Sequence, residues 1–403
     1  MTTYTTAMRR SIGGISFEDE DFIEKIIEVG KRFRPFSEAM DDFIANHGYD
    51  KDIHDVKSKV EFINNTFKAA DIKPPRNVKK WYEEGKAITR DTAYQICFAF
   101  GLDATETDDF FRRYYASERG FDCHRLEDAV YYCCMLNGWT YAVAQEIIDQ
   151  VGEEPAGTSY NTEVVYTESI IDDLKDIETK EDIITYLMEN RALFSVNNIT
   201  AFKTIQDLWR EIVAEDGLLV QENRYFYSIQ EDRLDKDIRI SPDMSASDVF
   251  IALFQLDREP ASRILEKHKS IGPILKNLHQ HIQDSFPNEQ GITKILRNDH
   301  FISYESIRKW LILLLFFTFW AKKSIKQGRQ DAQPEDRDRC IASINKFLVD
   351  AGYSELYEGN PYDWLFFYAI ADETPLPTFR WIWSSLMDKM LDEQHQQIQS
   401  MDQ

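Results

Sequence analysis

The sequence contains few of the residues that interrupt helices. Glycine (16 residues) and proline (12 residues) make up about 7% of the 403-residue chain, whereas about 12% is typical. A β-sandwich, a β-barrel or a disordered tail would need more turn-forming residues than this. Hydrophobic residues account for 43% of the chain, enough for a sizeable core. We therefore predict an all-α fold, with room for two or three domains.

Signals for export and for membrane insertion are also absent. The first residues, MTTYTTAMRRSIGG, contain two arginines, but no apolar run of about 7 to 15 residues follows them, as a secretory signal requires. The longest apolar stretch, Trp310 to Ala321, would rise only about 18 Å as a helix, short of the roughly 30 Å core of a bilayer. We expect a fully buried helix at this stretch, no membrane contact and a cytoplasmic location.

No catalytic or metal-binding signature is present. The sequence lacks a glycine-rich phosphate loop, a GxSxG elbow and an HExxH motif. Five cysteines are an odd number spread over a long chain, which favours reduced thiols over a disulfide framework. Cys133 and Cys134 could join Cys123 and His124 at a zinc ion, but adjacent residues on a helix point about 100° apart. We therefore predict no catalytic residues, no metal and no cofactor.

Composition and hydrophobic spacing divide the chain into four predicted parts. A lead-in over 1–35 precedes a helical domain over 36–151. The segment 152–180 is rich in small and acidic residues and is expected to be a linker, and a larger helical domain occupies 181–403. Within this last domain the pattern near 218–229 is typical of a small β-hairpin, because apolar and aromatic residues flank a turn-like centre.

An island of positive charge lies in this acidic chain, whose formal net charge is -23. Residues 73–90 contain six basic and two acidic side chains, which gives the island a net charge of +4. The acidic remainder would repel a phosphate backbone unless the island faced that backbone alone. Pro74 and Pro75 suit the start of a short helix and Gly85 suits its end, so we predict a helix over 76–84.

The side chains on this helix are of the types that contact DNA. Arginine suits guanine and asparagine suits adenine, which favours Arg76 and Asn77 as base-reading residues at the start of the helix. Lysines one turn further on share a face with Arg76 and suit phosphates. The complete set of candidate DNA-binding residues is Arg76, Asn77, Lys79, Lys80, Lys86 and Arg90.

Further basic residues lie on either side of the helix. Lys73, Arg112 and Arg113 are candidates for secondary phosphate contacts. In a competing interpretation, Arg112 and Arg113 pair with nearby Asp108 and Asp109, and the basic residues of the island form only a solvated face.

The run KWYEEGKAITRDTAYQICFAFGLDATETDDFF resembles the back half of a repressor-type (Cro/phage-repressor-like) helix-turn-helix domain. A recognition helix ends in a Gly-Lys turn at Gly85 and Lys86, Thr89 caps a helix that ends near Phe100, and a last helix opens with acidic residues. The resemblance covers roughly residues 55–115 and implies a five-helix, DNA-binding N-terminal domain. The turn in front of the recognition helix is longer than the family uses and contains prolines. The stretches FFRRYYASERGFDCHRLEDAVYYCCMLNGWTYAVAQEII and NPYDWLFFYAIA also look like uncharacterised proteins of Gram-positive bacteria and their mobile elements.

These observations lead to one main hypothesis and two alternatives. We expect a regulatory protein that binds duplex DNA, with a helical C-terminal domain that senses or docks a protein partner. A homodimer would suit this mode, because one half-site per short helix gives limited affinity. The first alternative is a non-enzymatic protein-interaction component of a mobile-element or phage-defence system. The second is an enzyme with an unrecognised site in the C-terminal domain.

Overall fold

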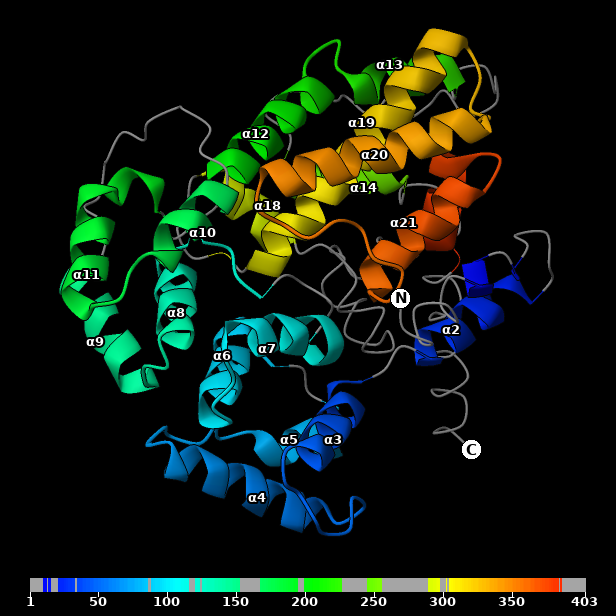
Figure 1. Ribbon diagram of the computed structural model, residues 1–403. Helices are drawn as coiled ribbons and strands as arrows, with labels where there is room; N and C mark the ends of the chain where they lie inside the picture. The colour runs from blue at the N-terminus through cyan, green and yellow to red at the C-terminus, as the bar shows by residue number, and fades with distance from the viewer. Residues whose placement is uncertain are drawn as a thin grey trace. The chain divides into compact units, whose positions relative to one another are not determined.

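The computed structural model is built from helices (Figure 1). It describes residues 10–12, 14–15, 21–32, 35–85, 88–115, 120–123, 125–152, 167–194, 199–226, 245–255, 289–297, 302, 304–383 and 385. Within these ranges every regular element is a helix, which confirms the predicted all-α fold.

The chain divides into two compact units that differ from the predicted parts. The first, which we call the inserted unit, comprises Arg34–Thr200 and Val349–Ser354. The second, the flanking unit, comprises Met1–Phe33, Ala201–Leu348 and Glu355–Gln403. Because the flanking unit takes residues from both sides of Arg34–Thr200, the two units are joined by more than one chain crossing.

In the inserted unit two groups of helices pack on each other through α7 and α8 (Figure 1). The first group surrounds the predicted DNA-binding segment: α3 (Phe36–Asn46), α4 (Val56–Ala69), α5 (Val78–Glu83), α6 (Arg90–Ala99), α7 (Ala104–Phe110) and the π-helix η1 (Phe111–Tyr115). The second group consists of α8 (Leu126–Leu136), α9 (Tyr141–Val151), α10 (Thr167–Lys175), α11 (Lys180–Glu189) and the short 3-10 helix η2 (Arg191–Leu193). A single hydrophobic core runs through both groups.

Side-chain caps define where several of these helices begin. The Asp55 carboxylate accepts hydrogen bonds from the N–H groups of Lys57 and Ser58 at the start of α4. Thr89 caps α6, as its position in the sequence predicts, and accepts from the Thr92 N–H. Such caps satisfy backbone N–H groups that have no partner within the helix, so these helix starts are fixed locally by the sequence.

The boundary between the two units lies later in the chain than the sequence predicts. Helices α10 and α11 pack on α8 and α9, although the expected linker covers 152–180 and the expected C-terminal domain starts at 181. Ile170 and Leu174 on α10, and Ile183 and Leu187 on α11, are buried in the core of the inserted unit. Their spacing of four residues places each pair on one helical face. The acidic residues between them lie on the outer face and make the segment resemble a linker.

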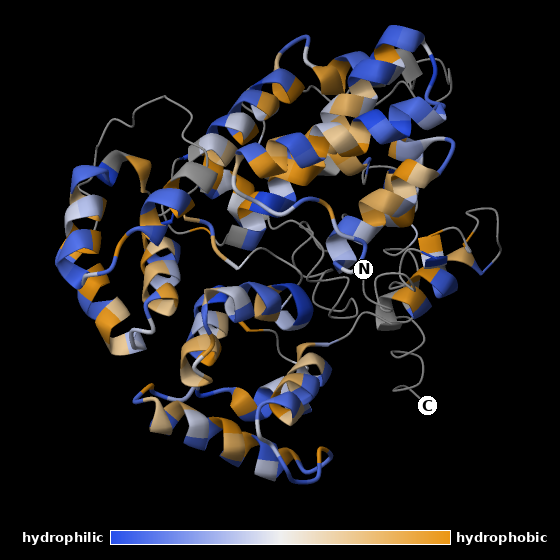
Figure 2. Ribbon diagram, viewed as in Figure 1, coloured by the Kyte–Doolittle hydropathy of each residue, from blue (hydrophilic) through white to orange (hydrophobic). Residues whose placement is uncertain are grey.

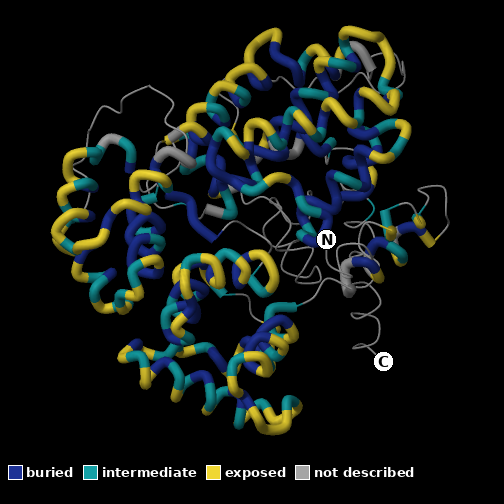
Figure 3. Tube along the Cα trace, viewed as in Figure 1, coloured by how far each residue is buried: buried dark blue, intermediate teal, exposed yellow. Residues whose placement is uncertain are grey.

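The helices of the flanking unit include one long apolar helix. They are α2 (Phe22–Arg32), α12 (Ile199–Val213), α13 (Leu218–Phe226), α14 (Ala246–Phe254), α18 (Glu289–Leu296), α19 (Tyr304–Gln327), α20 (Pro334–Asp350) and α21 (Pro361–Ala371). The stretch from Trp310 to Ala321 forms the centre of α19, and all but one of its side chains are buried, which confirms the predicted buried helix (Figures 2 and 3). Within the described residues, none of the helices combines the length and the apolar character that crossing a bilayer requires.

Most of the predicted lead-in over 1–35 belongs to the flanking unit, whose first segment ends at Phe33. The Phe22 ring lies 5.8 Å from the Tyr368 ring and 4.6 Å from the Trp381 ring. The Trp364 indole N–H donates to the Ser11 hydroxyl over 3.2 Å. The N-terminal residues therefore pack against side chains from the opposite end of the sequence within this unit.

The β-hairpin expected near 218–229 is wrong over its described part, because Leu218–Phe226 forms α13. Leu218 and Leu219 are buried, and Glu222, one turn later, forms a buried bidentate ion pair with Arg380 over 2.6 and 2.8 Å. The polar residues at the expected turn therefore lie on a helix. Residues 227–229 lie outside the described residues.

Candidate nucleic-acid interface

Helix α5 is held on one side by buried aromatic and aliphatic side chains. Val78 and Trp81 are buried, and Trp81 packs edge-on against Phe36 of α3 with 5.4 Å between the ring centroids. The Lys59 ammonium of α4 lies 4.1 Å from the centroid of the Tyr82 ring and pairs with Asp41 of α3. Since a six-residue helix has little stability of its own, α3 and α4 must supply it.

The opposite side of α5 presents the predicted lysines to solvent. The side chains of Lys79 and Lys80 are 69% and 54% exposed. Each pairs with the carboxylate four residues later, Lys79 with Glu83 over 3.0 Å and Lys80 with Glu84 over 3.1 Å. Exposed pairs of this kind are weak and exchange readily with other ions.

The residues in front of α5 stay close to it but outside the helix. The helix begins at Val78 and not at Arg76, because the Asn77 carbonyl is the first acceptor of its hydrogen-bond ladder. Arg76 and Lys73 are exposed, and neither has an ion pair with any carboxylate that the structure describes. Gly85 has φ +62°, which confirms its predicted role in ending the helix. The structure thus brings together Lys73, Arg76, Asn77, Lys79 and Lys80, while Lys86 lies outside the described residues.

Arg112 and Arg113 form ion pairs with nearby aspartates, as the competing interpretation predicts. Arg112 pairs with Asp108 over 2.7 Å and Arg113 pairs with Asp109 over 3.2 Å, one turn back on the same helical segment. Both arginines are more than half exposed. Their charges are therefore compensated locally, as those of Lys79 and Lys80 are, whereas Lys73 has no ion pair with a described carboxylate.

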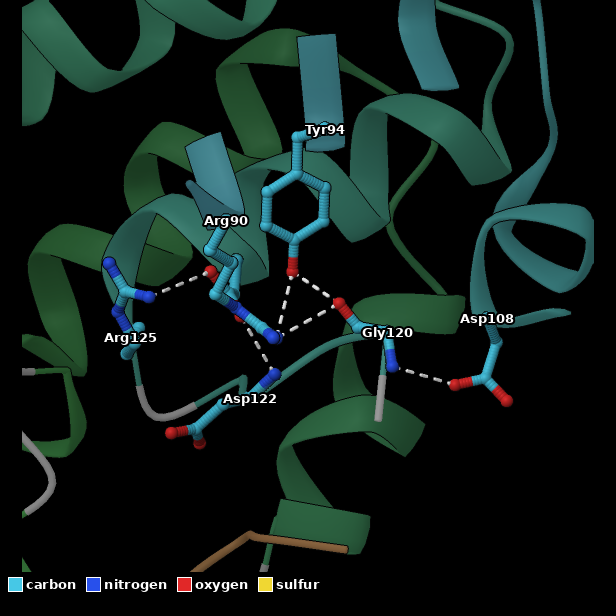
Figure 4. A network of polar contacts seen from close by, with 7 residues as sticks. Arg90, Tyr94, Asp108, Gly120, Asp122 and Arg125 are labelled. Carbon is cyan, nitrogen blue, oxygen red and sulfur yellow. Dashed lines mark hydrogen bonds and ion pairs between the residues drawn. The ribbon is translucent and has the colours of Figure 1, made fainter. Parts of the chain in front are cut away.

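The assignment of Arg90 as a DNA-binding residue is wrong. Its side chain is only 4% exposed, and its guanidinium donates two hydrogen bonds to the Asp128 carboxylate of α8, over 2.8 and 3.2 Å. The same guanidinium donates to the Gly120 carbonyl over 3.0 Å and contacts the Tyr94 hydroxyl at 3.2 Å (Figure 4). Its Cζ atom also lies 4.9 Å from the centroid of the Phe111 ring of η1. A side chain with these partners has no access to a phosphate or a base.

Further hydrogen bonds extend this buried network on both sides of Gly120 (Figure 4). The Gly120 N–H donates to Asp108 of α7 over 2.9 Å, and its carbonyl also accepts from the Tyr94 hydroxyl. The Asp122 N–H donates to Asp128 over 2.9 Å. We call this network, which consists of Arg90, Tyr94, Asp108, Gly120, Asp122 and Asp128, the clasp.

A side chain at position 120 would not fit into the clasp. A Cβ atom on Gly120 would lie 2.8 Å from the Asp108 Cα, a distance that real Cβ contacts do not show. Glycine is therefore required here for close approach of two backbones and not for an unusual φ angle. The residue fixes how closely 120–123 lies against α7.

The electrostatics of the clasp favour the charged form of Asp128. Burial opposes ionisation of Asp128, but Arg90, Arg125 and the hydrogen bonds to the carboxylate outweigh it and hold the pKa of Asp128 below its usual value. Arg125 approaches the second Asp128 oxygen at 3.7 Å. Burial raises the pKa of the Tyr94 hydroxyl well above its usual value, so this group remains a hydrogen-bond donor at physiological pH.

One signal in the sequence indicates the burial of Arg90. Ala93, Ile96 and Cys97 form the apolar face of α6 and are fully buried. Arg90 precedes Ala93 by three residues and Cys97 by seven, a spacing that places it on that same face. Its partners Gly120 and Asp128 have no comparable signal, because 30 and 38 residues separate them from Arg90.

The described residues give no indication of a metal site or a disulfide. Among them, no group of three or more histidine, cysteine or acidic side chains is arranged to hold a metal ion. All five cysteines fall within the described ranges, and each is buried without a disulfide bond. His124 lies outside the described residues.

The comparisons with known proteins add no relative to this picture. No protein-family model, no curated protein and no solved structure matches this chain.

Proposed function

We propose that this protein binds duplex DNA through the inserted unit, with α3 to α7 forming a repressor-like helix-turn-helix domain and α5 as its recognition helix. The observation that carries the proposal is the exposure of Lys73, Arg76, Lys79 and Lys80 around a helix whose opposite side is buried. The chain as a whole carries a net charge of -23. A phosphate backbone is therefore attracted at few places on the molecule, and this cluster combines exposed basic side chains with a buried anchoring face.

The residues of the cluster suit different contacts. Lys79 and Lys80 project from the helix and suit phosphates, whose oxygens would replace the Glu83 and Glu84 carboxylates as their partners. Arg76 has the donor pattern for guanine, and Asn77, at the start of α5, has the pattern for adenine. Base contacts by these two residues, a contact by Lys86 and binding as a homodimer are parts of the same proposal.

The affinity should depend strongly on salt and be modest. Three or four phosphate contacts release about as many counterions, so the logarithm of the binding constant should fall with the logarithm of salt concentration with a slope of about -3. A fourfold rise in salt would then weaken binding by roughly 60-fold. We expect the carboxylates next to the lysines to reduce the affinity further, because they compete with DNA for the same ammonium groups.

The test is a fluorescence-anisotropy titration of the full chain with random and host-promoter duplexes, at about 50 and 200 mM salt. We expect Lys79→Glu combined with Lys80→Glu to abolish binding. The matched control combines Lys175→Glu with Lys322→Glu, since both lysines are about half exposed and each pairs with a single carboxylate, Asp172 or Glu211. This control changes the net charge by the same amount and should bind like the unaltered chain.

Two results would contradict the proposal. Absence of binding by the unaltered chain at the lower salt would overturn DNA binding altogether and would favour a protein-interaction component. Equal losses in the test and control variants would show that overall charge, and not α5, determines the affinity. The sensing or docking role predicted for the C-terminal part stays a prediction that this titration does not address.

A further inference from the structure

We infer that Arg90 and Asp128 are positioning residues for α5, so that the second group of helices in the inserted unit determines how α5 is presented to DNA. The inference rests on the proposed function for its DNA readout. Neither residue touches the exposed face of α5. They act through α4, which packs against both α6 and α5.

The first step of the argument is that α5 does not fix its own position. It has six residues, and its side-chain anchors Trp81 and Tyr82 contact α3 and α4. Helix α4 packs against both α5 and α6. The position of α5 therefore depends on α3 and α4, and through α4 on α6.

The second step is that the clasp fixes the start of α6. Arg90 is the first residue of this helix, and its guanidinium donates to α8 through Asp128 and to the 120–123 segment through Gly120. All of these groups are buried, so water cannot take the place of a lost partner. When the carboxylate is removed, the guanidinium must move to find another acceptor, and the first turn of α6 moves with it.

The third step is that the clasp joins the two groups of helices in the inserted unit. Asp128 lies in the first turn of α8, which packs on α9, α10 and α11. Asp108 lies on α7 and holds the Gly120 N–H on the other side of the network. The clasp is therefore a hydrogen-bonded connection between α8 to α11 and the helices around the candidate interface, in addition to their apolar contacts.

A positioning role and a direct contact leave different signatures in a salt titration. If Asp128→Asn leaves α5 correctly placed in only about a tenth of the molecules, the apparent dissociation constant rises about tenfold. The phosphates contacted in the complex stay the same, so the slope against salt does not change. Loss of a direct phosphate contact would instead reduce the slope by about 0.9.

The experiment compares the full chain with Asp128→Asn and Ile147→Ala. Ile147 is fully buried in α9 and belongs to neither the clasp nor the candidate interface, so it reports what general destabilisation of the unit does. Arg90→Lys is the second clasp variant, because it keeps the positive charge and loses the planar guanidinium that donates several hydrogen bonds. It replaces Asp128→Asn if that chain does not fold. Each protein is studied by anisotropy over a range of salt and by amide hydrogen exchange at residues 78–84.

We expect the clasp variants to raise the dissociation constant about tenfold with an unchanged slope, and to speed amide exchange at 78–84 by at least about tenfold. Ile147→Ala should change neither. Unchanged exchange at 78–84 in the clasp variants, or equal changes in Ile147→Ala, would overturn the positioning role. If the unaltered chain binds no DNA, the proposed function fails, while the exchange data still decide whether the clasp positions α5.

Discussion

Two regions of the inserted unit use the same chemistry to opposite effect. On α5, Lys79 and Lys80 pair with carboxylates four residues away in solvent. In the clasp, Arg90 pairs with a carboxylate 38 residues away, and the Arg90 and Asp128 side chains are 4% and 1% exposed. An exposed pair contributes about 0 to 1 kcal/mol and can exchange its partner for a phosphate, whereas a buried pair cannot be opened without leaving a charge unsolvated. Burial, and not residue type, thus separates a candidate contact residue from a residue that holds the fold.

The flanking unit repeats the buried arrangement. Arg308 and Asp363 form a bidentate pair over 2.7 and 2.8 Å, and both side chains are nearly inaccessible to solvent. Like Arg90 and Asp128, they lie far apart in the sequence, and Asp363 also accepts from the Tyr357 N–H. Buried arginine–carboxylate pairs that join distant segments are therefore common to both units. The basic cluster around α5 contrasts with both buried pairs, because Lys73 and Arg76 are exposed and Lys79 and Lys80 pair with carboxylates in solvent.

The largest effect is expected when one member of the buried pair is removed. Asp128→Ala leaves the Arg90 guanidinium buried without its counterion, which should cost about 3 to 5 kcal/mol in the free energy of unfolding. Urea unfolding monitored by hydrogen exchange at amides of the inserted unit would measure this loss for that unit alone. Asp363→Ala is the matched control, since it should destabilise the flanking unit by a similar amount and leave exchange in residues 126–151 unchanged. A loss below about 1 kcal/mol would show that the buried pair behaves like an exposed one.

A smaller effect is expected at Gly120. Gly120→Ala forces a Cβ to within 2.8 Å of the Asp108 Cα, and separating the two backbones should cost about 2 to 3 kcal/mol. Gly101→Ala is the matched control, because Gly101 has φ +67° and no heavy atom within 4 Å of its missing Cβ. Backbone strain alone should cost about 1 kcal/mol there. Equal losses of unfolding free energy in the two variants would contradict a steric requirement at position 120.

The dependence of stability on pH provides a third test of the same contrast. Because the folded-state pKa of Asp128 lies below its unfolded value, its contribution to stability is full above the unfolded pKa of about 3.9 and is lost as pH falls through the folded pKa. The urea midpoint of the inserted unit should therefore fall more steeply below pH 4 in the unaltered chain than in Asp128→Asn. The two curves should converge at low pH. Asp55 also has a lowered pKa, but it is present in both proteins, so parallel curves would contradict a role for Asp128.

Local features of the fold could be predicted from the sequence because their causes are local. The cap at Thr89, the end of α5 at Gly85 and the burial of α19 each follow from a few neighbouring residues. The division of the chain could not be predicted in the same way. Phe22 completes a core with Tyr368, a contact between residues at opposite ends of the sequence for which one chain offers no signal.

In the candidate site, too, the features with local causes could be predicted and those that depend on distant residues could not. The exposure of Lys79 and Lys80 follows from the burial of Val78 and Trp81, which their spacing on a short helix already indicates. The basic character of Arg90 and its closeness in sequence predict the same surface for it, although its spacing from Ala93 places it on the apolar face of α6. Its true partner, Asp128, lies on a helix of the other group, and only the packing of the chain brings the two together.

The smallest expected effect tests whether the exposed pairs on α5 restrain DNA binding. In Glu83→Gln combined with Glu84→Gln, the lysines lose their carboxylate partners and two negative charges leave the interface. A unit charge about 8 Å from a phosphate in water is worth about 0.5 kcal/mol, so removing two should raise the affinity at low salt about fivefold. Unfolding free energy should change by no more than about 0.5 kcal/mol per pair, because such pairs stabilise a helix only slightly. The control, Asp172→Asn combined with Glu211→Gln, releases Lys175 and Lys322 from equivalent pairs outside α5, and it should leave the affinity unchanged. A weaker affinity in the α5 variant would mean that the carboxylates hold the lysines in the orientation that DNA requires, and not that they compete with it.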